Sequence, residues 1–220
     1  MDLGSIVVQI SILALPVIFA ITLHEAAHGY VARHFGDLTA YQAGRISLNP
    51  LRHIDPVGTV LVPLVVYFTT AAAGGQGLLF GWAKPVPVNF SRLHHPKRDM
   101  LWVAIAGPAA NLLMGVVWVA VAKIVLVSGG ASLAAAWLYR NAETGIIINV
   151  VLMILNLIPL PPLDGGRIAV SLLPNPYAYR YAQIEPYGMV ILIGLLILLN
   201  SSGASIMHYE QALLTFLLRS

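Results

Sequence analysis

Charged residues are scarce in this chain of 220 amino acids. Lys, Arg, Asp and Glu together make up 10%, whereas soluble domains usually carry about 25%. Hydrophobic residues make up 58%, and the mean hydropathy is +0.81. So little charge could not cover the surface of a water-soluble domain of this size, which excludes a cytosolic enzyme, a nucleic-acid-binding protein and a disordered chain. The sequence therefore predicts an integral membrane protein, with residues 1–220 forming one domain.

Cysteine is absent altogether. This excludes disulfides and thiolate-bound metal, so any metal ion must be held by His, Asp or Glu. The first residues also lack the positive charges of a signal peptide, and no small-residue cleavage site follows the first apolar run. We therefore expect this run to be a retained membrane helix.

Apolar runs divide the chain into candidate membrane segments, judged against the roughly 20 residues that a spanning helix needs. The runs cover about 5–35, 57–73, 99–127 and 144–173, followed by 187–199 and 206–218. The second run contains Pro63 and continues into Gly74 and Gly75, a composition that favours a broken segment. The expected fold is an all-α polytopic membrane protein with about four to six membrane segments.

The positions of Lys and Arg bear on how the second run lies in the membrane. These residues gather in the loops after the first, second and fourth runs, whereas 128–142 holds only Arg140. If 57–73 crossed the membrane, two strongly basic loops would lie on opposite sides, against the positive-inside tendency. The distribution therefore favours a re-entrant segment at 57–73 with both basic loops in the cytoplasm. A plain spanning helix is the alternative.

The stretch from Phe80 to Asn89 cannot be helical, because Pro85 and Pro87 fall within three residues. It is predicted to form a short extended or β element between the first helix and the third, with an edge strand near the membrane surface as one form. Such a strand could pair with an unfolded peptide, and a structural loop is the alternative.

His24, Glu25 and His28 form the strongest motif, His-Glu-Ala-Ala-His, inside the first apolar run. At about 100° per residue, the two His side chains lie one turn apart on one face of a helix. Both imidazoles can then bind one Zn²⁺, with Glu25 beside the open coordination position as general base. Each ionisable side chain in an apolar helix costs roughly 3 kcal/mol unless it has a partner, and a metal ion would account for all three.

A catalytic zinc site usually has three protein ligands, and Asp164 is the candidate for the third. It is the only acidic residue in the run 144–173. Prolines break the run before it, and the glycines 165–166 permit close approach and unusual backbone geometry. If both bind one ion, His28 and Asp164 must lie within roughly 4 Å of each other. The alternative is that Asp164 caps a helix or pairs with Arg167.

Four other polar residues are candidates for supporting roles. Asn111 and Asn156 lie in apolar runs, where an unpaired amide is costly. Each is a candidate for stabilising an oxyanion or holding the substrate backbone, and Asn111 is the stronger of the two. The alternative is that they form hydrogen bonds between the third and fourth runs. His53 and Asp55 could form a pair near the metal, but a turn that begins at Asp-Pro is the preferred interpretation.

Together these elements resemble the site-2 protease family of intramembrane zinc metalloproteases, in its short prokaryotic form without a PDZ domain. The matching parts are the His-Glu-Ala-Ala-His motif at 24–28, Ala-Gly-Pro-Ala-Ala-Asn at 106–111, and the stretch 156–166 with its Leu-Asp-Gly. The stretches 44–58 and 80–89 resemble a prokaryotic subgroup. The family resemblance implies that His24, His28 and Asp164 are the three protein ligands of one zinc ion per chain. It also implies that Glu25 is the catalytic base.

The resemblance also implies an endopeptidase that hydrolyses a peptide bond within or next to a membrane-spanning substrate helix. Zinc-activated water would attack the bond while Glu25 takes up the proton. The expected location is the prokaryotic plasma membrane, with several crossings and a site open to the cytoplasm. The expected partners are a membrane-spanning substrate and the lipid bilayer, and no nucleic acid. The alternative is a membrane zinc transporter or sensor without hydrolytic activity, which would not need Glu25 beside a ligand.

Overall fold

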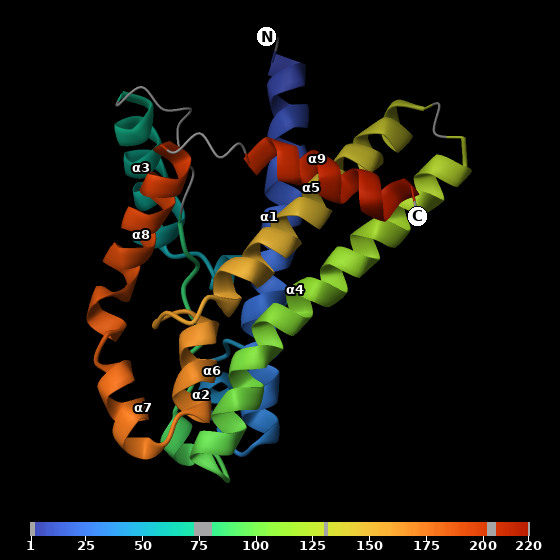
Figure 1. Cartoon of the computed structure of the whole chain (residues 1–220). Helices are drawn as coiled ribbons and strands as arrows, with labels where there is room; N and C mark the ends of the chain where they lie inside the picture. The colour runs from blue at the N-terminus through green and yellow to red at the C-terminus, as the bar shows by residue number, and fades with distance from the viewer. Residues whose placement is uncertain (1–2, 73–80, 130–131, 202–205, 220) are drawn as a thin grey trace.

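The computed structural model describes residues 3–72, 81–129, 132–201 and 206–219, which form a group of helices (Figure 1). No strand occurs among these residues. In chain order the elements are α1 (Leu3–His34), α2 (Thr39–Gln42), η1 (Pro50–Arg52), η2 (Pro56–Leu61), α3 (Val62–Ala72), η3 (Phe90–Arg92), α4 (Pro96–Val127), α5 (Leu133–Leu157), α6 (Asp164–Leu172), α7 (Asn175–Ala182), α8 (Glu185–Ser201) and α9 (Ile206–Arg219).

Three helices of the described chain, α1, α4 and α5, are long and apolar enough to cross a membrane. Helices α7 and α8, which meet at a bend of 62°, form a fourth candidate span if the two are counted as one. In the most apolar part of each of these helices, only 22–28% of the residues are buried inside the protein. Helices of this length and apolar composition are compatible with a multi-pass membrane protein. Of the four to six segments expected, the structure supports three or four.

The helix bounds follow the expected runs closely, with one difference. α5 begins at Leu133 and not near residue 144, because the Ser132 hydroxyl accepts a hydrogen bond from the Ala135 N–H and caps its first turn. The predicted break is confirmed, since α5 ends at Leu157, before the prolines, and α6 begins at Asp164.

The segment between α1 and α4 begins and ends at the same end of the molecule. α1 runs down to this end in Figure 1, α4 rises from it, and the His94 N–H donates to the Phe35 carbonyl at 2.9 Å. α3 lies at the upper left of Figure 1, and the apolar helical stretch Pro56–Thr70 is shorter than a full span. Residues 73–80, which include both glycines of the predicted break, lie outside the described residues.

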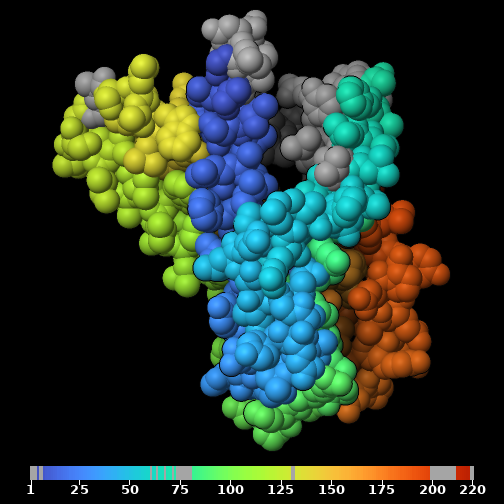
Figure 2. Space-filling model, turned by 180° about the vertical axis from the view of Figure 1, so that it is seen from behind, coloured from blue at the N-terminus to red at the C-terminus, as the bar shows by residue number. Residues whose placement is uncertain are grey.

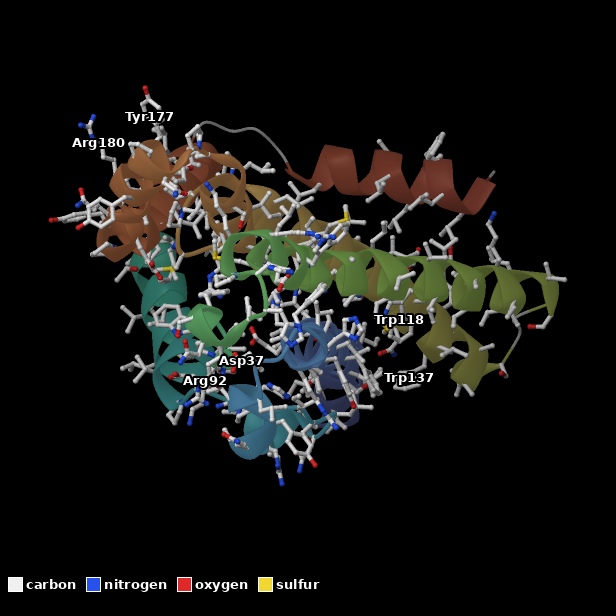
Figure 3. All side chains as sticks on the ribbon, turned by 90° about the horizontal axis from the view of Figure 1, so that it is seen from below. Asp37, Arg92, Trp118, Trp137, Tyr177 and Arg180 are labelled. Atoms are coloured by element: carbon white, nitrogen blue, oxygen red, sulfur yellow. The ribbon has the colours of Figure 1, made fainter. Side chains whose placement is uncertain are left out.

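Figure 2 shows what this segment covers. Seen from behind, the residues that follow α1 (light blue to cyan) cover its lower half, whereas the dark blue upper half lies on the surface. At the lower end, Asp37 and Arg92 lie close together, just beyond α1 and just before α4 (Figure 3). On this side, protein therefore covers the lower half of α1 and leaves its upper half exposed.

The predicted extended or β element is not confirmed, because residues 81–89 pair with no strand of the described chain. Pro85 and Pro87 have no N–H to contribute to a ladder. Four other N–H groups of the segment each donate to a separate acceptor at 2.6–3.0 Å: Trp82 to the Gly58 carbonyl, Lys84 to the His53 carbonyl, Val86 to the Glu25 carboxylate and Asn89 to the Asp37 carboxylate. Phe80, the first residue of the predicted element, lies outside the described residues.

α4 is the central helix and packs against α1, α5 and α6. Its Trp118 is buried against Ala142 and Ile146 of α5. A Cβ at Gly145 would lie 2.5 Å from the Trp118 ring, so only glycine allows this approach of the two helices. The close packing of α4 brings side chains of α1, α5 and α6 to one place.

Candidate metal centre

His24 and His28 lie one turn apart on α1, and their imidazoles meet. Their Nε2 atoms are 3.1 Å apart, and the ring planes stand at 83° to each other. Each residue is 8% exposed. The i and i+4 spacing therefore brings both nitrogens to one point, as the motif predicts.

Asp164, the first residue of α6, brings its carboxylate to the same point. Its Oδ2 lies 3.2 Å from His24 Nε2 and 3.3 Å from His28 Nε2, and accepts no hydrogen bond in the described structure. Arg167, the alternative partner, places its guanidinium over the Phe90 ring. The carboxylate is thus directed at the two imidazoles.

Gly165 and Gly166 let α6 pack onto the connection that follows α5. A Cβ at Gly165 would lie 2.3 Å from the Ile158 carbonyl oxygen, and one at Gly166 would lie 2.3 Å from Pro161 N. Neither glycine has a positive φ. The predicted close approach is therefore confirmed, and the predicted unusual backbone geometry is wrong.

Gly107 of α4 leaves the space that the two imidazoles occupy. A Cβ at this position would lie 2.4 Å from His28 Nε2 and 2.5 Å from His24 Cε1. No side chain fits between α4 and the rings, so the imidazoles pack directly against the backbone of α4.

The far side of each ring is bonded to α4. His28 Nδ1 lies 2.7 Å from the Val103 carbonyl oxygen, and His24 Nδ1 lies 2.6 Å from Asn111 Oδ1. Partners of this kind fix the orientation of metal-binding histidines in proteins. Both Nε2 atoms are thereby turned toward Asp164.

The three ligand atoms fit a zinc ion. Zinc binds imidazole nitrogen at about 2.0–2.1 Å and carboxylate oxygen at about 2.0–2.2 Å, so two ligands of a tetrahedral ion lie about 3.4 Å apart. The observed separations are 3.1, 3.2 and 3.3 Å. Among the described residues, this is the group of three or more potential ligands that comes close enough to hold a metal ion. The donor set, two imidazoles and one carboxylate, is typical of catalytic zinc.

Glu25, the predicted base, is half buried and contacts the irregular segment 81–89. Its Oε2 accepts a hydrogen bond from the Val86 N–H at 2.7 Å. Sequence reasoning did not identify Val86, although a signal was present. In Pro85-Val86-Pro87, only the middle residue has an N–H to offer.

The two asparagines use their amides within the helix group. Asn111 accepts from His24 and donates its Nδ2 to Asn149 Oδ1 at 3.0 Å. Asn156 donates its Nδ2 to the Leu152 carbonyl of its own helix at 3.0 Å. Asn149 was not a sequence-based candidate.

His53 and Asp55 serve the turn before η2. The Asp55 carboxylate accepts from the Val57 and Gly58 N–H groups, and His53 Nε2 lies 2.8 Å from the Ser47 carbonyl oxygen. The Asp55 contacts agree with the preferred interpretation of a turn that begins at Asp-Pro, whereas the His53 contact lies in the loop before it.

Comparison with known proteins finds related sequences but no related solved structure. The profile described as peptidase family M50 matches residues 123–199, which include Asp164. YwhC of Bacillus subtilis is 38% identical over 187 residues, which cover 84% of this chain and 80% of YwhC. Rip2 of Mycolicibacterium smegmatis is 30% identical over 189 residues, 82% of this chain and 64% of Rip2. Both are named as candidate zinc metalloproteases.

A more distant relative is the zinc metalloprotease MJ0392 of Methanocaldococcus jannaschii, 24% identical over 160 residues, which cover 73% of this chain and 34% of the relative. No solved structure matches the chain. The identity to YwhC extends over most of both proteins. The chain therefore belongs to peptidase family M50, the site-2 protease family of zinc metalloproteases.

Proposed function

We propose that this protein is an intramembrane zinc endopeptidase that hydrolyses a peptide bond within or next to a membrane-spanning substrate helix. The observation that carries the proposal is the convergence of three ligand atoms from α1 and α6, 3.1–3.3 Å apart and buried. Family membership supports zinc-dependent proteolysis. Two ligands lie on α1, which is long and apolar enough to span a membrane, and this supports a substrate within the bilayer.

His24, His28 and Asp164 would hold one zinc ion per chain. When bound, zinc supplies a Lewis acid for the scissile carbonyl and lowers the pKa of water toward neutrality. Glu25 would take the proton from the attacking water and pass it to the leaving amine. Because the Val86 N–H occupies Oε2, we assign proton transfer to Oε1.

We assign the two asparagines different roles. Asn111 is bonded to His24 and to Asn149, so it would support a ligand and not contact the oxyanion. Asn156 lies near the end of α5, before the connection to α6, and stays the candidate for holding the substrate backbone.

The same proposal includes an orientation. The segment between α1 and α4 starts and ends at one end of the molecule, which supports a re-entrant segment for 57–73. With the positive-inside tendency, this end would face the cytoplasm of a prokaryotic cell and water would enter from there.

Glu25→Gln tests the role of the base. We expect the variant to keep one zinc ion per chain while its cleavage of a model spanning peptide falls by about 10²–10⁴-fold. Glu143→Gln on α5 is the control, since Glu143 lines a different hollow with Gln9 and Arg140. Undiminished cleavage by Glu25→Gln would exclude Glu25 as the base. Zinc flux into proteoliposomes without any peptide cleavage would favour the transporter alternative.

A further inference from the structure

A line of three hydrogen bonds runs from His24 through α4 into α5. His24 Nδ1 lies 2.6 Å from Asn111 Oδ1, Asn111 Nδ2 lies 3.0 Å from Asn149 Oδ1, and Asn149 Nδ2 lies 2.8 Å from the Gly145 carbonyl oxygen. Asn111 is 1% exposed and Asn149 is 0% exposed. No solvent reaches these amides, so each bond must be satisfied within the protein.

Which group donates and which accepts along these three hydrogen bonds is fixed at the α5 end. A carbonyl oxygen can only accept, so Asn149 must turn its NH₂ group to Gly145 and its oxygen to Asn111. Asn111 must then turn its NH₂ group to Asn149 and its oxygen to His24. An amide oxygen can only accept as well, so His24 must carry its proton on Nδ1.

These donor and acceptor roles matter because the other ring nitrogen of His24, Nε2, belongs to the metal centre. With the proton on Nδ1, the Nε2 lone pair points at Asp164 and at His28 Nε2. His28 reaches the same state by a shorter route, since its Nδ1 faces the Val103 carbonyl directly. An Asn111 amide rotated by 180° would offer NH₂ to His24 Nδ1 and would place the proton on Nε2, inside the centre.

Asn149 is the contact that decides the rotation of Asn111. The other acceptor near Asn111 Nδ2 is the Ala20 carbonyl oxygen at 3.4 Å, beyond the usual 2.7–3.2 Å of such bonds. We propose that Asn149 is a positioning residue that sets the tautomer of His24 through Asn111 and so keeps Nε2 open for a cation. The inference rests on the proposed function only in taking that cation to be zinc.

Two substitutions separate this role from packing. Asn149→Leu removes both hydrogen bonds and frees Asn111 to rotate. Asn149→Asp keeps an oxygen that accepts from Asn111, and in its neutral form its hydroxyl can donate to Gly145. Asn141→Leu is the matched control, because Asn141 is also buried on α5 and donates its Nδ2 to a carbonyl four residues earlier, that of Trp137.

The readout is the ¹⁵N NMR spectrum of histidine in the full-length, metal-free protein in lipid nanodiscs, with the His24 signals assigned by substitution. We expect His24 Nδ1 to carry a proton in the unsubstituted protein, in Asn149→Asp and in Asn141→Leu, whether or not the metal-free centre also holds a proton between Nε2 and its neighbours. In Asn149→Leu a neutral His24 that lacks the Nδ1 proton, the Nε2–H tautomer, should become detectable. Zinc affinity, measured by competition with a chelator, should fall by about 10–100-fold in Asn149→Leu alone.

An unchanged His24 tautomer in folded Asn149→Leu would overturn the inference, as would equal effects of the Leu and Asp substitutions. If Asn149→Leu does not fold, Asn149→Ser answers the same question, because its shorter side chain withdraws the acceptor from Asn111. Failure of the proposed function looks different. Absence of zinc binding or of peptide cleavage by the unsubstituted protein would leave the tautomer result standing, since it is measured without metal.

Discussion

The candidate site has a metal half, formed by His24, His28 and Asp164, and a base half, formed by Glu25, and the two are held in place by different kinds of contact. Helix side chains form the metal half, in which α1, α4 and α6 meet and each imidazole is bonded on its far side. The base half depends on one backbone N–H, that of Val86, in an irregular segment attached at scattered points. The metal half should therefore persist when the segment moves, whereas the alignment of Glu25 should depend on it. Metal binding and turnover should respond separately to substitutions in the two halves.

Gly107→Ala should have the largest effect, because it disrupts the metal half. The added Cβ would lie 2.4 Å from His28 Nε2, so at least one imidazole must leave its position. Overpacking of this kind costs about 1–3 kcal/mol, and we expect zinc affinity to fall at least tenfold. Chelator competition would measure the loss.

Gly115→Ala is the control on the same helix. Its Cβ would meet only Asn149 Cβ, at an ordinary 3.8 Å, and should leave zinc affinity unchanged. Equal zinc affinity in Gly107→Ala and Gly115→Ala would contradict the tight fit of α4 against the rings.

Val86→Pro tests the base half alone. Proline removes the N–H that bonds Glu25, so turnover should fall by about tenfold or more while zinc content stays at one per chain. Val86→Ala, which keeps the N–H, should lose much less turnover. A loss of zinc in Val86→Pro would show that the two halves are not separable.

Asp37→Asn should have the smallest effect, because it loosens only the anchor of the irregular segment. Burial raises the pKa of Asp37, but hydrogen bonds from Thr39 and Asn89 and the charge of Arg92 outweigh it and lower the pKa below the ordinary 3.8. Its stabilising contribution is therefore complete above about pH 3.8 and is lost as the pH falls through the lowered pKa.

At neutral pH the substitution should weaken attachment of residues 81–93 by about 1–2 kcal/mol, since an amide nitrogen cannot accept from the Asn89 N–H. Hydrogen exchange of this segment would measure the change, with Glu185→Gln at the exposed start of α8 as the control. The difference between Asp37→Asn and the unsubstituted protein should shrink in acid. A difference that grows in acid would contradict the assignment.

The same contrast explains what could be predicted from the sequence. His24 and His28 follow from helical spacing, and Asp164 follows from being a single acid in an apolar run, because both signals are local or compositional. The Val86 contact joins residues 61 positions apart through a backbone N–H. The flanking prolines mark that N–H as the one on offer, but nothing in the sequence identifies Glu25 as its acceptor. The expected strand failed for a related reason, because four N–H groups of that segment donate to four separate acceptors and not to a neighbouring strand.

Asn149 lay beyond sequence reasoning as well. Three asparagines of α5, Asn141, Asn149 and Asn156, all donate to carbonyls four residues earlier, so they look alike along the helix. Only the packing of α4 against α5 shows that Asn149 also meets Asn111.

The central claim is that His24, His28 and Asp164 converge on one zinc ion, and zinc content with X-ray absorption at the zinc edge tests it most directly. The unsubstituted protein should hold one zinc per chain with two imidazole nitrogens and a carboxylate oxygen at about 2.0–2.2 Å. Asp164→Ala should lose most of its zinc after dialysis and lack the carboxylate signal. Unchanged zinc content and an unchanged spectrum in Asp164→Ala would contradict the account.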